Sequence, residues 1–107
     1  MYAVLRRITV QPHFLEESVR RVERGLMPLL RNQTGFVELY VVQVGEGEGV
    51  SISIFATKED AEDGNKKSLE WAKEQIFPLA VGPAEIVGLG EILLHQKKQS
   101  EATRNML

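Results

Sequence analysis

Apolar side chains recur at two spacings along the chain, and the order of these spacings predicts the order of its elements. Residues 2–10, 36–44, 50–56 and 84–95 carry apolar side chains at alternate positions or in short runs, as β-strands do. Two other segments repeat apolar side chains at steps of three and four, which places each set largely on one helical face. The first set is Leu15, Val19, Val22, Leu26 and Leu29. The second is Ala61, Leu69, Ala72 and Ile76, with the polar Asn65 as the one exception on the same face. The predicted order is strand, helix, strand, strand, helix, strand.

Local signals mark where both helices begin and end. Gly25 and Pro28 predict a kink or an early end in the first helix, because proline lacks an amide donor and clashes with the carbonyl four residues earlier. Thr57 and Asp60 predict the start of the second helix as a capping box, in which a hydroxyl and an acidic side chain satisfy free amides. The segment FPLAVGP, residues 77–83, ends that helix.

The glycine-rich segment GEGEG, residues 45–49, is predicted to be a hairpin turn. A phosphate-binding glycine loop leads from a strand into a helix whose N-terminal amides face the anion, whereas this segment leads into another strand. Its carboxylates, Glu46 and Glu48, would also repel a phosphate. Because glycine permits the positive backbone angles of tight turns, the segment indicates a bend and not a binding site.

The element order is that of the ferredoxin-like fold. In this α+β architecture, βαββαβ in order, two helices cover one face of a four-stranded antiparallel sheet. Residues 1–96 are predicted to form one such domain, and residues 97–107 a polar C-terminal tail.

The second strand predicts that the sheet has two apolar faces. Its apolar side chains fall on both sides, with Phe36, Tyr40, Val42 and Val44 on one and Val37, Leu39 and Val41 on the other. Because two helices cover only one face, we expect a second copy of the chain to cover the other, in a symmetric homodimer. Ser51 and Ser53 alternate with apolar residues in the third strand, and we expect them to make this interface less apolar.

Composition narrows the classes of function. The 107 residues contain no cysteine, which excludes disulfides, thiolate nucleophiles and iron–sulfur clusters and is compatible with a reducing cytoplasm. The formal charge of −2 lacks the positive field that nonspecific nucleic-acid binding requires. The N-terminal MYAVLRRITV has arginines inside its apolar run, unlike a secretory signal or a membrane span. We therefore expect a cytoplasmic protein with neither nucleic acid nor membrane as a partner.

Four segments carry a resemblance to a known family: MYAVLRR, PLLRNQTGFVELYVV, VSISIFATKEDAE and EWAKE. Through them the chain resembles the antibiotic biosynthesis monooxygenase-like family of the dimeric α/β-barrel superfamily. The resemblance implies that two copies pair their sheets into a dimeric α/β barrel, with a ligand cleft between each sheet and its helices. The family mixes cofactor-free oxygenases of polyphenols, haem-degrading enzymes and members of unknown role, so the fold alone does not select an activity.

The resemblance to cofactor-free oxygenases points to two catalytic candidates. These enzymes are associated with an asparagine and a tryptophan on or near the second helix, and Asn65 and Trp71 are the residues that match. In that role Asn65 would stabilise developing charge and Trp71 would enclose the substrate. The alternatives are an amide satisfied by structural partners and an indole that packs as an ordinary core residue. The family's tyrosine has no counterpart after Trp71 in this helix.

Arg6 is a candidate for substrate binding. Arg6 and Arg7 lie on opposite faces of the apolar first strand, so at least one of them enters a covered layer. There it is predicted either to hold a carboxylate or phenolate of a ligand or to form an ion pair with an acid of the protein. The available acids are Glu38, Glu85 and Glu91.

Tyr40 and Ser68 are further substrate-binding candidates. Tyr40 has a hydroxyl that could donate a hydrogen bond to a ligand, although tyrosine also fits a strand without a functional role. Ser68 and Gly64 are small residues on the helix that carries Trp71, and we expect them to leave space beside the indole.

The sequence predicts no metal and no cofactor. Haem-degrading relatives pair an asparagine on the first strand with a histidine ligand on the second helix, whereas this chain has arginines in that strand and no histidine in that helix. His13 and His95 are predicted to lie at opposite ends of the sheet, which disfavours a two-histidine metal site.

These residues together favour a cofactor-independent oxygenase of a small aromatic metabolite, of the phenol or quinol type. The alternative is a non-catalytic dimeric module that binds a small molecule or a protein partner. A haem-binding protein is the least favoured interpretation.

Overall fold

The computed structural model describes residues 1–98 of the chain. Its strands are β1 (Tyr2–Thr9), β2 (Phe36–Gly45), β3 (Glu48–Phe55) and β4 (Glu85–Glu91). Its helical segments are η1 (Pro12–Phe14), α1 (Leu15–Arg21), η2 (Val22–Leu26), α2 (Met27–Arg31), α3 (Lys58–Gln75) and η3 (Phe77–Leu79). From residue 99 on, the predicted polar tail lies outside the described residues.

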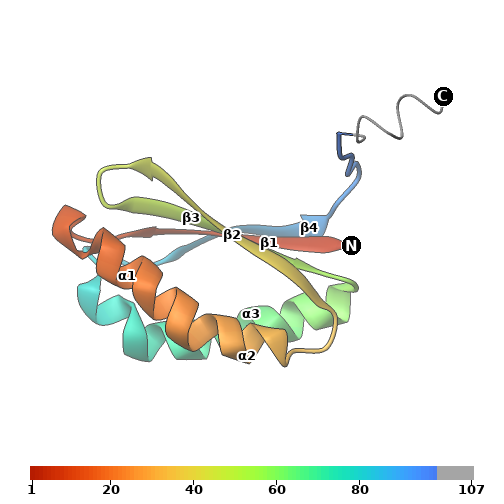
Figure 1. The fold of residues 1–107 in the computed structure, drawn as a ribbon, viewed down its shortest axis with the longest axis horizontal. Coiled ribbons are helices and arrows are strands. Elements are labelled where there is room, and N and C mark those ends of the chain that lie inside the picture. The colour runs from red at the N-terminus through yellow and green to blue at the C-terminus, as the bar shows by residue number, and fades with distance from the viewer. Residues whose placement is uncertain (99–107) are drawn as a thin grey trace.

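The four strands form one antiparallel sheet in the order β2-β3-β1-β4. Figure 1 shows both long helical segments on one face of this sheet, with the other face open. This arrangement confirms the predicted ferredoxin-like α+β fold. Among residues 1–98, no helix combines the length and the apolar character needed to cross a membrane.

The first helix contains a π-helical turn in place of the predicted kink or early end. In this turn, η2, the Met27 amide donates to the carbonyl of Val22, five residues earlier. The turn directly precedes Pro28, which has no amide to donate and would crowd the carbonyl four residues back in a regular helix. The wider turn accommodates this defect, and Figure 1 shows the helix continuing into α2.

The GEGEG segment forms a tight hairpin turn, as predicted. The turn residues are Glu46 and Gly47, and Gly47 has a φ of 69°. Its carbonyl accepts a hydrogen bond of 2.8 Å from the Val10 amide, and a Cβ on Gly47 would lie 2.2 Å from the Val10 carbonyl oxygen. Glycine is therefore required both by the backbone angle and by the close approach to the end of β1.

β4 is shorter than predicted. It ends at Glu91 and not near residue 95, and Leu93 and Leu94 are highly exposed. The ladder to β1 finishes where the Ile92 amide donates to the Met1 carbonyl at 2.8 Å. Residues 93–98 follow outside the ladder, so their apolar side chains do not join the sheet.

A β-bulge changes the faces of β2. The pairing with β3 shifts between Phe36 and Glu38, so one extra residue lies in β2. Phe36 therefore faces the helices, where its ring packs edge-on against Phe55 at 5.8 Å. The expectation that Phe36 shares a face with Tyr40 was wrong, because the extra residue at the bulge reverses the alternation of side chains in β2.

The core lies between the sheet and the helices, built around Val4, Leu26, Leu30, Phe55 and Ala61. Small residues of α3 face the sheet, and a Cβ on Gly64 would lie 2.3 Å from the Phe55 ring. The Thr57 hydroxyl caps α3 by accepting the Asp60 amide at 3.1 Å, as predicted.

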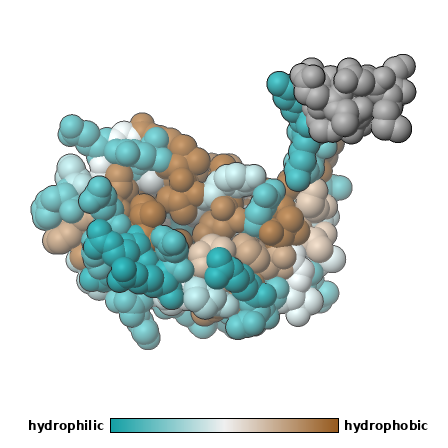
Figure 2. Space-filling model, viewed as in Figure 1, coloured by the Kyte–Doolittle hydropathy of each residue, from teal (hydrophilic) through white to brown (hydrophobic). Residues whose placement is uncertain are grey.

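Ser51 and Ser53 face the helices, which corrects their assignment to the open face. Ser51, Ser53 and Phe55 occupy alternate positions of β3, so their side chains lie on the same face of the sheet. Both serines line pockets that also involve α3. The open face of the sheet instead carries Val50 and Ile52 from β3 and Tyr40 and Val42 from β2. Figure 2 shows apolar surface along the β2–β3 hairpin. This face is thus more apolar than the sequence suggested.

Candidate functional site

A cavity of about 80 Å³ lies between the sheet and the helices. Its walls come from β1, β2 and β3 on one side and from α1, η2 and α3 on the other. Most lining side chains are apolar, and the polar ones are Arg6, Ser18, Ser51 and Ser68. Such walls favour an apolar ligand whose few polar groups meet fixed partners.

A surface groove of about 450 Å³ adjoins this cavity. The two share lining residues Leu15, Val19, Val41 and Gly49. The cavity alone is smaller than the roughly 150 Å³ in which an engineered apolar cavity accepts benzene. An aromatic ligand would therefore use the cavity together with part of the groove.

Arg6 and Asn65 meet at the wall of the cavity. Arg6 lies between Val4 and Ile8 at alternate positions of β1, so its side chain is on the same face as theirs and points toward the helices. Its Nη2 group donates to the side-chain Oδ1 of Asn65 and, at 3.4 Å, to the backbone carbonyl of the same residue. This contact thus joins one catalytic candidate, Asn65, to one substrate-binding candidate, Arg6.

Within residues 1–98, Arg6 does not form the ion pair with an acid that was one of its two predicted roles. The ion pairs there involve Arg20, Arg21 and Lys67, and none involves Arg6. Glu38, one of the expected partners, lies on the open face, where its carboxylate accepts a hydrogen bond from Tyr40. Because of the bulge in β2 and the alternation of β1, the side chains of Glu38 and Arg6 lie on opposite faces of the sheet.

The Arg6 guanidinium is a half-buried cation without an acidic partner in residues 1–98. Burial lowers the pKa of Arg6 from its ordinary value. Its Nε is buried and, among the described residues, has no hydrogen-bond partner. A buried charged donor of this kind favours an acceptor or anion beside it.

Trp71 packs across the cavity against the π-helical turn. A Cβ on Gly25 would lie 2.8 Å from the Trp71 Nε1, so the indole lies directly on the Gly25 backbone. Trp71 lines the cavity and also an outer groove beside Arg24. The expected space near Gly64 is absent, because the Phe55 ring fills it.

Ser68 connects the two catalytic candidates. This buried residue of α3 lines the main cavity with Trp71 and a second, smaller pocket with Asn65. The smaller pocket, of about 10 Å³, also involves Ser51 and Ser53, which the sequence analysis did not select. Their shared alternation with Phe55 was the signal that could have found them, since the largest apolar side chain of β3 marks its buried face.

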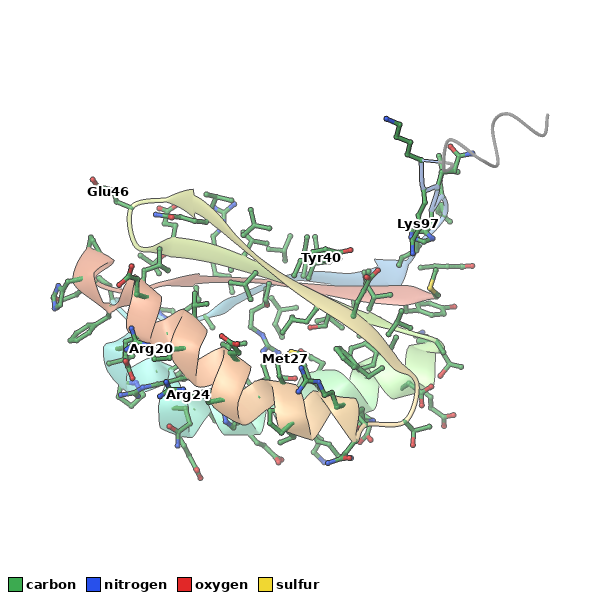
Figure 3. All side chains as sticks on the ribbon, in the orientation of Figure 1. Arg20, Arg24, Met27, Tyr40, Glu46 and Lys97 are labelled. Atoms are coloured by element: carbon green, nitrogen blue, oxygen red, sulfur yellow. The ribbon has the colours of Figure 1, made fainter. Side chains whose placement is uncertain are left out.

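Tyr40 lies away from this cavity. β2 directs it to the open face, where its side chain is 51% exposed, and Figure 3 shows it on the side of the sheet opposite the helices. Its hydroxyl donates to Glu38 at 3.0 Å, and this hydrogen bond together with the nearby negative charge raises the pKa of Tyr40. The structure therefore does not bring Tyr40 to the other candidates.

The two histidines lie at opposite ends of the sheet, as predicted. His13 follows the end of β1, and His95 follows the end of β4, which runs antiparallel to β1. Within residues 1–98, no group of three or more His, Asp or Glu side chains is placed to hold a metal ion. The main cavity offers a guanidinium and hydroxyls as hydrogen-bond donors, and the smaller pocket adds the amide of Asn65.

The sequence model of the antibiotic biosynthesis monooxygenase family matches residues 1–66, more than half of the chain. The chain belongs to this family. The match to the antibiotic biosynthesis monooxygenase family includes Arg6 and Asn65 and ends before Ser68 and Trp71. Among functionally curated proteins, none matches the chain in sequence.

Several solved structures share the fold of this chain. SnoaB, a cofactor-independent oxygenase from Streptomyces nogalater, is 17% identical, with a TM-score of 0.67 over 91% of this chain and 97% of its own. The ActVA-Orf6 monooxygenase of Streptomyces coelicolor, in complex with nanaomycin D, is also 17% identical, with a TM-score of 0.67 over 88% and 92%. Rv0793 from Mycobacterium tuberculosis is 15% identical, with a TM-score of 0.68 over 90% and 98%. At such identities the likeness concerns the fold alone.

Proposed function

We propose that the protein is a cofactor-independent oxygenase of a small aromatic metabolite of the phenol or quinol type. The observation that carries this proposal is the Arg6 guanidinium, which an amide holds at the wall of an apolar cavity without a carboxylate partner in residues 1–98. A phenol bound with its oxygen near this cation has a lowered pKa. The resulting phenolate is the electron-rich form that reacts with oxygen directly.

The reaction inserts one oxygen atom into the ring and forms one water. The phenolate supplies electrons to dioxygen, a new carbon–oxygen bond forms at a ring carbon, and the oxygen–oxygen bond then breaks. The ring carbon loses its hydrogen, so that phenol and dioxygen give quinone and water. The aromatic substrate is the reductant, and the four electrons it loses are those that dioxygen accepts.

Each residue of the site has a role in this reaction. Arg6 holds the phenolate oxygen, and the amide of Asn65 stabilises charge that develops on oxygen. Trp71 and the apolar side chains of η2 and α1 enclose the ring and exclude water. Ser68 offers a hydroxyl between the positions of Asn65 and Trp71.

The proposal includes a homodimer in the cytoplasm. Tyr40 and Val42 of β2, beside Val50 and Ile52 of β3, leave an apolar strip on the open face of the sheet, and a second copy would cover it. The partner sheet would also shield Tyr40, whose role in substrate binding remains a prediction. The cytoplasmic location follows the cysteine-free sequence.

A non-catalytic binding module is the second candidate. The observation that favours it is the Arg6–Asn65 hydrogen bond itself, because this contact gives the amide a structural partner. Haem degradation has less support, because α3 contains no histidine that could ligate iron.

Oxygen uptake by metal-free protein tests the proposal. Simple hydroquinones and naphthols are the probes, and their methyl ethers, which cannot ionise, are the matched controls. We expect uptake with the free phenols, quinone as the product, and none with the ethers. Binding of the phenols without uptake would reject the oxygenase and leave the binding module.

A further inference from the structure

The outer groove beside Arg24, of about 310 Å³, lies between the first helix and α3. Its side chains include Arg20 and Arg21 of α1, Arg24 of η2, and Trp71 and Gln75 of α3. Figure 3 shows Arg20 and Arg24 on the flank of the first helix away from the β2–β3 hairpin. Trp71 is the one lining residue that this groove shares with the main cavity. We call it the arginine groove.

The arginine groove concentrates positive charge on a chain whose formal charge is −2. Its lining has three arginines and a single acid, Glu17, which leaves an excess of two positive charges. The Glu17 carboxylate accepts hydrogen bonds from Arg20 at 2.7 Å and from Arg21 at 3.1 Å. The hydrogen bond from Arg21 and the charges of Arg20, Arg21 and Arg24 lower the pKa of Glu17. The one acid is thus already paired, and positive charge remains for a ligand.

The donors of the groove are held in place by the two helical segments. Arg21 also donates from Nη1 to the backbone carbonyl of Gln75 at 2.7 Å, which ties α1 to the end of α3. Arg24 is exposed and takes part in none of the ion pairs within residues 1–98. Because Gly25 has no side chain, the Trp71 indole lies on its backbone with Nε1 nearest. The N–H donor of the ring therefore lies beside the groove.

We propose that the arginine groove binds the phosphate group of a small molecule, at a site apart from the cavity of the proposed oxygenase. A phosphate monoester carries a charge of about −1.5 to −2 and three acceptor oxygens, which matches the excess of two positive charges. Guanidinium groups bind such oxygens in pairs, and Arg24 has no carboxylate partner in residues 1–98 that competes for it. A carboxylate ligand, with one charge and two oxygens, would leave part of the positive charge uncompensated.

The indole signal of Trp71 tests the site in the whole chain. Trp71 is the sole tryptophan, so a nitrogen–proton correlation spectrum of isotope-labelled protein contains one indole N–H signal. Inorganic phosphate is the probe, titrated at constant ionic strength because screening alone weakens exposed charges. We expect a saturable shift of the indole signal and of the backbone amides around Arg24. Shifts that do not saturate, or that gather around Arg6 in β1, would overturn the proposal.

Arg24→Gln and Arg31→Gln separate a defined site from general attraction. Arg24 is exposed, so its replacement should leave the fold intact and weaken phosphate binding about tenfold, the effect of one charged hydrogen bond. Arg31→Gln removes the same charge from an exposed position of α2 outside the groove and should bind phosphate as the wild type does. Equal weakening by both variants would show long-range attraction only and overturn the site.

Acetate tests the class of ligand in the same titration. With fewer oxygens and a smaller charge, it should bind about tenfold more weakly than phosphate. An affinity for acetate equal to that for phosphate would overturn the assignment of a phosphate ligand. Because the readout needs no turnover, the outcome is independent of oxygen uptake.

Discussion

The Nη2 group of Arg6 on β1 donates hydrogen bonds to both the side-chain Oδ1 and the backbone carbonyl of Asn65 on α3. Because a guanidinium only donates hydrogen bonds, the amide oxygen of Asn65 must face Arg6. The NH₂ group of Asn65 then remains to donate to a ligand. This contact joins β1 to α3, and the polar side chains that line the smaller pocket around it include no carboxylate, which suits an anionic oxygen.

Asn65→Asp separates the structural role of this contact from the catalytic one. An aspartate keeps an acceptor for Arg6 and adds a negative charge that neutralises the guanidinium. We expect the fold to remain at least as stable, because the Arg6 guanidinium compensates the charge of the new carboxylate. The rate of oxygen uptake should fall about 100-fold or more, since the site no longer favours a phenolate. The measurements are urea unfolding and oxygen consumption.

Asn65→Ala is the comparison for that variant. It leaves the Arg6 Nη2 without its partner and should lower the free energy of unfolding by about 1–3 kcal/mol. Oxygen uptake should fall in both variants. Undiminished uptake by Asn65→Asp would contradict the proposed role of the Arg6 charge.

Gly25→Ala tests the contact between the π-helical turn and Trp71. The new Cβ would lie 2.8 Å from Nε1 and 3.0 Å from Cζ2 of the indole, so the ring must move. Overpacking of this kind costs about 1–3 kcal/mol, partly offset by the roughly 1 kcal/mol that alanine gains over glycine in a helix. We expect a lower thermal midpoint and a changed emission spectrum of Trp71, the sole tryptophan.

Gly82→Ala is the matched control for Gly25→Ala. A Cβ there meets nothing within 4 Å, and the backbone angle is not positive. It should leave both the midpoint and the emission unchanged. An emission spectrum that Gly25→Ala also leaves unchanged would contradict the close packing of the indole on η2.

The sequence predicted the order of elements because apolar periodicity is a local property. The hairpin at Gly47 and the cap at Thr57 were likewise local signals, and both are confirmed. The faces of β2 were not predictable in this way. The extra residue between Phe36 and Glu38 is visible only in the pairing with β3, so the alternation failed at the bulge.

The structure brings four of the five candidate site residues together, because Asn65, Trp71, Ser68 and Arg6 lie around two adjoining pockets. Their roles in binding or catalysis stay predictions. That Arg6 would meet an amide was not predictable, because its choice among acids and amides depends on which face each strand presents. Ser51 and Ser53 were missed although they alternate with Phe55, whose large apolar side chain marks the buried face of β3.

Asp63 gives the fold a specific acid sensitivity. Its carboxylate accepts a hydrogen bond of 2.9 Å from buried Gln33 and lies 3.3 Å from the Lys67 Nζ, and these contacts lower the pKa of Asp63. Because the pKa is lower in the folded protein, the contact stabilises the fold above the unfolded pKa, about 3.9, and this stabilisation is lost as the pH falls through the folded value.

Asp63→Asn should therefore reduce stability near neutral pH and flatten its decline below about pH 4. Urea unfolding at a series of pH values measures both effects. Glu70→Gln, on the exposed side of the same helix, is the control and should retain the wild-type profile. Parallel acid profiles for Asp63→Asn and the wild type would show that the Asp63 contacts do not shift its pKa.

Ile52→Glu tests the proposed homodimer at the centre of the open face, where Ile52 is paired with Tyr40 on the neighbouring strand. A charge there would be buried without a partner in a sheet-to-sheet interface, so the variant should be monomeric while the wild type is a dimer. Sedimentation velocity gives the mass, and circular dichroism checks the fold. Val81→Glu, at a 63% exposed position before β4, adds the same charge outside the sheet and should leave the dimer intact. A dimer that tolerates Ile52→Glu would place its interface elsewhere than on the open face.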